Sequence, residues 1–96
     1  MLVRLTRIIK SNNDFSLKEI FINPSEVSYL VEDEGMKRDL KEGIISFNFH
    51  QSTGFTRLHI KSSGSLEEFT VIGDPHLIEE KIRNSILQGR KQLLKG

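Results

Sequence analysis

The chain has 96 residues and a mass of 11.0 kDa, the usual size of one domain. Its composition is 36% hydrophobic and 28% charged, which excludes an intrinsically disordered chain. The absence of cysteine excludes disulfides, thiolate metal sites and thiol nucleophiles. The formal charge of +1 excludes functions that need a strong overall field, such as a histone-like coat on nucleic acid.

The first residues, MLVRLTR, lack the apolar segment and the cleavage site of a secretory signal. No window approaches the run of about 20 apolar residues that spans a bilayer. A chain without cysteine also suits a reducing compartment. We therefore expect a cytoplasmic protein with no membrane segment.

Apolar and polar residues alternate through the first part of the chain, which is typical of half-buried strands. The pair Asn12-Asn13 suits a two-residue hairpin loop, because asparagine tolerates positive φ. This loop places Val3 opposite Ile22. Residues 26–32 are predicted as a further strand.

A three-stranded meander is predicted for residues 44–50, 55–61 and 66–72. The first pairing places Phe47 opposite Leu58, and the second, across a short turn, places Leu58 opposite Phe69. Both registers put Leu58 on the same face. Since a slip of one residue would invert a strand, this agreement favours the meander.

Two further segments break the alternation. Residues 33–43 are polar and are predicted as a mobile loop with one helical turn near its middle. Residues 75–94 are predicted as a helix, because Ile78, Ile82 and Ile86 recur at steps of four and make an apolar stripe.

The predicted fold is a mainly β, α+β single domain over residues 1–96. About six antiparallel strands within residues 2–73 form hairpins and a meander, in a curled sheet or small barrel, followed by one C-terminal helix.

Motifs for nucleotide binding, zinc hydrolysis or a serine nucleophile are absent. Glu67 and Glu68 are neighbours in a strand, so their side chains point to opposite faces and cannot form a dyad. His59 is expected opposite Glu68 as a solvated pair, beside Arg57 and Lys61, whose charges discourage a metal. We predict no catalytic residue, no cofactor and no metal site, and hence no enzyme.

The helix is expected to cover the sheet face that bears Phe47. The other face, with Arg4, Phe21, Phe55 and Arg57, is then free for a partner. We interpret the chain as a regulatory accessory protein that acts through protein–protein contacts, and apolar residues on both faces predict a homodimer. The alternative is a nucleic-acid-binding module, because cations interleaved with exposed aromatic residues suit single strands.

Several strings together resemble the small FlbD/SwrD-type family: VRLTR at residues 3–7, IFINP at residues 20–24, VSYLVE at residues 27–32, and a later strand before an isoleucine-rich helix. The resemblance implies a cytoplasmic, non-catalytic accessory factor of the kind associated with flagellar and swarming motility, with relatives in phage genomes. The insertion at residues 33–43, the fuller meander and the longer basic tail depart from the family pattern. No functional residue transfers, because the family has no catalytic motif.

Overall fold

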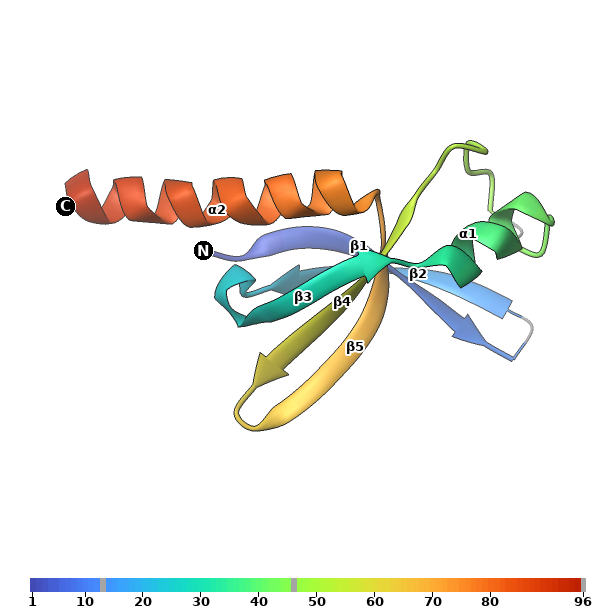
Figure 1. The fold of residues 1–96 in the computed structure, drawn as a ribbon, viewed down its shortest axis with the longest axis horizontal. Coiled ribbons are helices and arrows are strands. Elements are labelled where there is room, and N and C mark those ends of the chain that lie inside the picture. Colours follow the sequence, from blue (N-terminus) through green and yellow to red (C-terminus); the bar gives the residue numbers. More distant parts are fainter. Residues whose placement is uncertain (13, 46, 96) are drawn as a thin grey trace.

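The computed structural model describes residues 1–12, 14–45 and 47–95, with side chains through Gly89. Within these residues, five antiparallel strands form one sheet in the order β2-β1-β5-β4-β3. The strands are β1 (Val3–Ser11), β2 (Asp14–Ile22), β3 (Val27–Glu32), β4 (Phe55–Ser62) and β5 (Ser65–Ile72). The helical elements are the 3-10 turn η1 (Pro24–Glu26), α1 (Glu34–Lys41) and α2 (Pro75–Lys95). Figure 1 shows α2 running along the sheet and reaching past its end.

The mainly β prediction with a C-terminal helix is confirmed, whereas six strands and a barrel are wrong. The sheet is open, with β2 and β3 at its edges. The predicted strand at residues 44–50 is irregular in its described part, and residue 46 lies outside the described residues. β4 pairs instead with β3, where Leu30 lies opposite Leu58. Ile45, Phe47 and Phe49 of this segment pack into a core, and its described residues form no hydrogen-bonded ladder.

The other two hairpins form as predicted. Val3 lies opposite Ile22 between β1 and β2, and Leu58 lies opposite Phe69 between β4 and β5. In the second turn Ser63 and Gly64 both have positive φ, of 49° and 81°. This conformation matches the right-handed twist of the flanking strands.

One core lies between the sheet and α2. Its buried residues include Leu58 and Val71 from the sheet and Ile78 and Ile82 from the helix, with Ile86 packed against them. The predicted helix stripe therefore does cover a sheet face. The expectation that this face also bears Phe47 is wrong, because Phe47 packs elsewhere.

A second core lies on the opposite face, and we call it the α1-side core. It consists of buried Ile8, Leu40, Ile45 and Phe55, with Phe15, Met36, Phe47, Phe49 and Ile72 packed against it. Residues 33–43 therefore contain more helix than the single turn predicted near their middle. They contain a helix that begins after Asp33, whose carboxylate accepts the Met36 N–H at 3.0 Å.

Candidate functional site

The four residues predicted to contact a partner lie on the face of the α1-side core, but they are not equally accessible. Phe55 has no exposed surface, so its expected availability is wrong. Residues 44–50 and α1 cover it, instead of forming a strand and a loop. Phe21 is 59% exposed on edge strand β2, opposite Arg4 of β1. Arg57 lies farther along the sheet, on β4 between β3 and β5.

The two arginines of this face are paired with carboxylates. Arg4 Nε lies 3.9 Å from Glu19 Oε2 in an exposed pair. Arg57 bridges two strands, with Nη2 3.6 Å from Asp33 Oδ1 and Nε 3.3 Å from Glu68 Oε1. Both arginines of this face therefore lie beside carboxylates.

Asp33 organises the junction between β3 and α1. Its carboxylate is nearly buried and accepts hydrogen bonds from the Met36 N–H and, at 2.5 Å, from Thr70 Oγ1. Burial raises the pKa of this carboxyl. The hydrogen bonds from Thr70 and Met36 and the positive charge of Arg57 lower the pKa, and their combined effect exceeds that of burial. The pKa of Asp33 therefore lies below its ordinary value of 3.8. Asp33 is held as an anion that ties α1 to the sheet.

His59 lies opposite Glu68 as predicted, but it is not solvated. It is only 7% exposed, because the Tyr29 ring stacks on it with centroids 3.9 Å apart. Its Nδ1 lies 3.6 Å from Glu68 Oε2. Over the described residues, no three His, Cys, Asp or Glu side chains are grouped so as to hold a metal ion.

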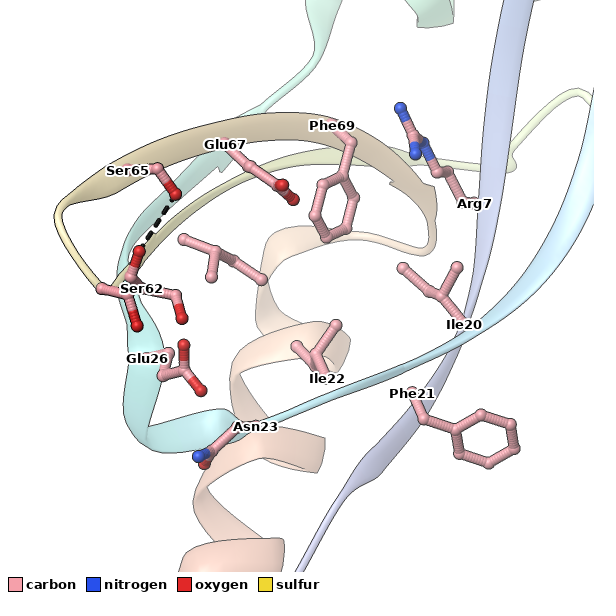
Figure 2. Close-up of a pocket in the computed structure, with 12 residues that line it drawn as sticks. Arg7, Ile20, Phe21, Ile22, Asn23, Glu26, Ser62, Ser65, Glu67 and Phe69 are labelled. Carbon is pink, nitrogen blue, oxygen red and sulfur yellow. Dashed lines mark hydrogen bonds between the residues drawn. The ribbon is translucent and has the colours of Figure 1, made fainter.

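A cavity of about 450 Å³ opens on the α2 face, beside the end of β2 and the β4–β5 turn. Figure 2 shows the Phe69 ring between Glu67 and Arg7, and Phe21 pointing away from this group. The Arg7 guanidinium carbon lies 5.1 Å from the Phe69 ring centroid. Glu26 adds a second carboxylate to the lining. Charges of both signs around an apolar floor do not define one ligand chemistry.

A second hollow, of about 420 Å³, runs between β3 and α2, and we call it the β3 groove. Its apolar lining consists of Pro24, Val27, Leu30, Ile82, Ile86 and Leu87, together with Tyr29. On its helix side, Arg83 Nη1 lies 3.7 Å from Glu79 Oε1, so these charges pair with each other. The β3 groove is therefore an apolar channel beside an edge strand.

The backbone of β3 offers hydrogen-bonding groups along this channel. The Asp33 N–H donates to the Phe55 carbonyl at 2.9 Å, in line with the β3–β4 register. Because bonded and non-bonded pairs alternate along an antiparallel ladder, Val31 also points its backbone groups toward β4. Leu30 and Glu32 then point theirs outward. Over the described residues, β4 is the only strand beside β3.

The sequence alone predicted the strand at residues 26–32 but gave it no neighbour, so its free edge was missed. The available signal was the apolar row Tyr29, Leu30 and Val31, which leaves side chains on both faces of one short strand.

Comparisons of the chain with protein-family models, with curated proteins and with solved structures find no match. The FlbD/SwrD resemblance therefore stays a prediction. Within the described part of the chain, no helix is long and apolar enough to cross a membrane.

Proposed function

We propose that this chain is a small, non-catalytic binding protein of the cytoplasm that regulates through protein–protein contacts. A partner chain adds an extended strand to the free edge of β3. The observation that carries the proposal is the outward backbone of Leu30 and Glu32 beside the apolar β3 groove. In such strand addition the backbone bonds supply affinity and pockets for alternate side chains supply specificity.

The side chains around the edge match this mode of binding. Leu30 faces the α2 side of the sheet, so a residue opposite it on the added strand points into the β3 groove. The flanking residues of the added strand lie over Tyr29 and Val31, which are 52% and 42% exposed on the other face. An extended segment with three consecutive apolar residues therefore fits both faces of the edge.

The opposite edge of the sheet is less suited to a partner strand. β2 carries Lys18 and Glu19 at its middle, and charged residues on an edge strand oppose pairing. On β3 the charged residue Glu32 is at the end of the strand, next to its ion-pair partner Lys37.

The nucleic-acid alternative has less support from the described side chains. Its predicted platform loses Phe55, which is buried, and Arg4 and Arg57 lie beside carboxylates. Phe21 of the same platform is exposed. We expect single-stranded DNA and RNA to bind no tighter than millimolar at 100 mM salt. Micromolar binding that weakens steeply with salt would favour the alternative.

A site-specific photo-cross-link tests strand addition, and the absence of cysteine makes the labelling clean. A benzophenone maleimide is attached to Val31→Cys or to the control Leu17→Cys, which replaces a residue of equal exposure on β2 (42% and 41%). Each labelled protein is irradiated in extract of its native cell. We expect a protein adduct from position 31 and none from position 17.

Two proline variants show whether the adduct depends on the β3 edge. Glu32→Pro removes an outward N–H and leaves the β3–β4 ladder intact. Glu19→Pro makes the same change on β2. The pair Ser11–Asp14 closes the β1–β2 hairpin and is hydrogen-bonded, and because bonded and non-bonded pairs alternate from there, the N–H of Glu19 points outward. Glu32→Pro should abolish the adduct and Glu19→Pro should not. An adduct insensitive to Glu32→Pro, or none at position 31, would overturn the proposed function.

A further inference from the structure

We infer that the strand which fits the β3 edge is β3 of a second copy of this chain, paired antiparallel about a two-fold axis at Leu30. This inference rests on the proposed function, because it names the partner of the same edge. The resulting dimer has one continuous sheet, with both α2 helices on the same side.

The pairing is self-complementary in this register. Leu30 meets Leu30 of the second copy, and each Tyr29 meets a Val31 across the junction on the opposite face. Aromatic residues pair favourably with β-branched residues across antiparallel strands. Glu32 meets Ser28, so no like charges face each other. The three apolar residues Tyr29, Leu30 and Val31 therefore each receive an apolar neighbour.

The outward backbone groups also match in this register. Leu30 faces Leu30 of the second copy, so residues with outward N–H and C=O groups oppose one another at the axis, and Glu32 faces Ser28, where β3 bulges against β4. Tyr29 and Val31, which bond toward β4, form the non-bonded pair between them. Hydrogen bonding is thus compatible with the alignment that side-chain pairing favours.

Neighbouring registers fit less well. An axis at Tyr29 places Leu30 opposite Ser28 of the second copy, so Leu30 gains a polar neighbour instead of an apolar one. An axis at Val31 places Leu30 opposite Glu32, so a carboxylate enters the apolar β3 groove.

The second copy also provides an apolar cover for a surface that the single chain leaves open. Tyr29, Val31 and Leu87 are exposed apolar side chains at this edge, and Leu30 lies beside them in the β3 groove. Two copies bring these side chains together around the axis, where each set covers the other. The second copy therefore supplies the apolar side chains that this surface needs, and no other protein is required to cover it.

Cysteine scanning along β3 tests the register. Tyr29→Cys, Leu30→Cys and Val31→Cys are oxidised separately, with Leu17→Cys on β2 as the control, and circular dichroism confirms that each is folded. We expect only Leu30→Cys to form a disulfide-linked dimer, because its Cα atoms would lie about 5.5 Å apart. A mixture of Tyr29→Cys and Val31→Cys should form the mixed dimer. Self-linking of Tyr29→Cys or Val31→Cys in preference to Leu30→Cys would overturn the register.

Light scattering tests the partner with the unmodified chain. We expect a mass of twice 11.0 kDa, dimerisation that is roughly tenfold or more weaker in Glu32→Pro, and no weakening in Glu19→Pro. A monomer at millimolar concentration overturns the inference. If position 31 still cross-links to a different protein in an edge-dependent manner, the proposed function stands. If it cross-links to nothing, both fail.

Discussion

The two faces of the sheet are closed by different means. On one face α2 contributes a regular stripe, with Ile78 and Ile82 packed over Leu58. On the other face a short helix and an irregular segment contribute Leu40 and Ile45, yet Phe55 beneath them is as completely buried as Leu58. Irregular chain can therefore close a sheet face as well as a helix does. What it needs is apolar side chains at suitable positions and hydrogen bonds for its own backbone.

The comparison of the two faces is tested most strongly by replacing one large buried side chain in each core with alanine. We expect Phe55→Ala to lower the free energy of unfolding by about 3–5 kcal/mol and Leu58→Ala by about 2–5 kcal/mol. Both side chains are fully buried. The measurement is urea unfolding followed by circular dichroism.

Phe21→Ala is the matched control, because it removes the same ring from an exposed position. Phe21→Ala should change the free energy of unfolding by less than about 0.5 kcal/mol. If Phe55→Ala were no more costly than Phe21→Ala, the α1-side core would not be a core in solution.

A second test concerns the contact between the segment that covers the α1-side core and the segment that leads into α2. Gly54 ends the segment that crosses the α1-side core, and Asp74 leads into α2. A Cβ on Gly54 would lie 1.8 Å from Asp74 Oδ1 and 3.2 Å from Asp74 Cα. We expect Gly54→Ala to lower the free energy of unfolding by about 1–3 kcal/mol, because the two segments must move apart.

Gly89→Ala is the control for this change. Gly89 lies within α2, and a Cβ there would meet nothing within 4 Å. Thermal melting should show stabilisation of up to about 1 kcal/mol, since alanine favours the helix. Destabilisation by Gly54→Ala together with stabilisation by Gly89→Ala would support the junction, whereas stabilisation by Gly54→Ala would contradict it.

The same contrast explains what the sequence could predict. The α2 stripe and the two short hairpins depend on local signals: a step of four residues, and loops of asparagine or serine and glycine. Residues 44–50 have the alternation of a strand, but a ladder also needs a free neighbouring edge. β3 occupies that side of β4, and its pairing joins segments far apart in the chain, which local periodicity cannot detect.

The candidate site shows the same limit. The sequence correctly placed Phe55 and Arg57 on one face, because alternation in a strand fixes the face. It could not show that Phe55 is covered, since the cover comes from residues 44–50 and α1. Nor could it show that β3 lies at an edge beside α2, because this depends on the strand order of the whole sheet.

The pH dependence of the free energy of unfolding tests how α1 is held on the sheet. The folded-state pKa of Asp33 is lowered, so the carboxylate contributes stability above pH 3.8 that is lost as the pH falls through the folded pKa. Asp33→Ala should lower the free energy of unfolding at pH 7 by about 0.5–2 kcal/mol, the usual cost of losing a helix N-cap.

Asp33→Asn separates the cap from the charge. Asparagine also caps helices, so this variant should retain α1 while losing part of the stability decrease below pH 3.8. Urea unfolding between pH 2 and pH 7 gives the comparison. Parallel pH profiles of the wild-type protein and Asp33→Asn would contradict the assigned role of the charge.

The smallest expected effect on the free energy of unfolding is at the exposed pair Arg4 and Glu19, which lies on the same face of the sheet but outside the α1-side core. Arg4 and Glu19 are exposed, and their atoms are 3.9 Å apart, so water and salt screen their attraction. We expect Arg4→Gln to change the free energy of unfolding by less than about 0.5 kcal/mol, and the change to shrink further in 1 M salt. Arg57→Gln should cost more at both salt concentrations, because it removes the cation beside the nearly buried Asp33. Equal costs for the two arginines would show that α1 does not shield Asp33 from solvent, and that this face is uniformly open.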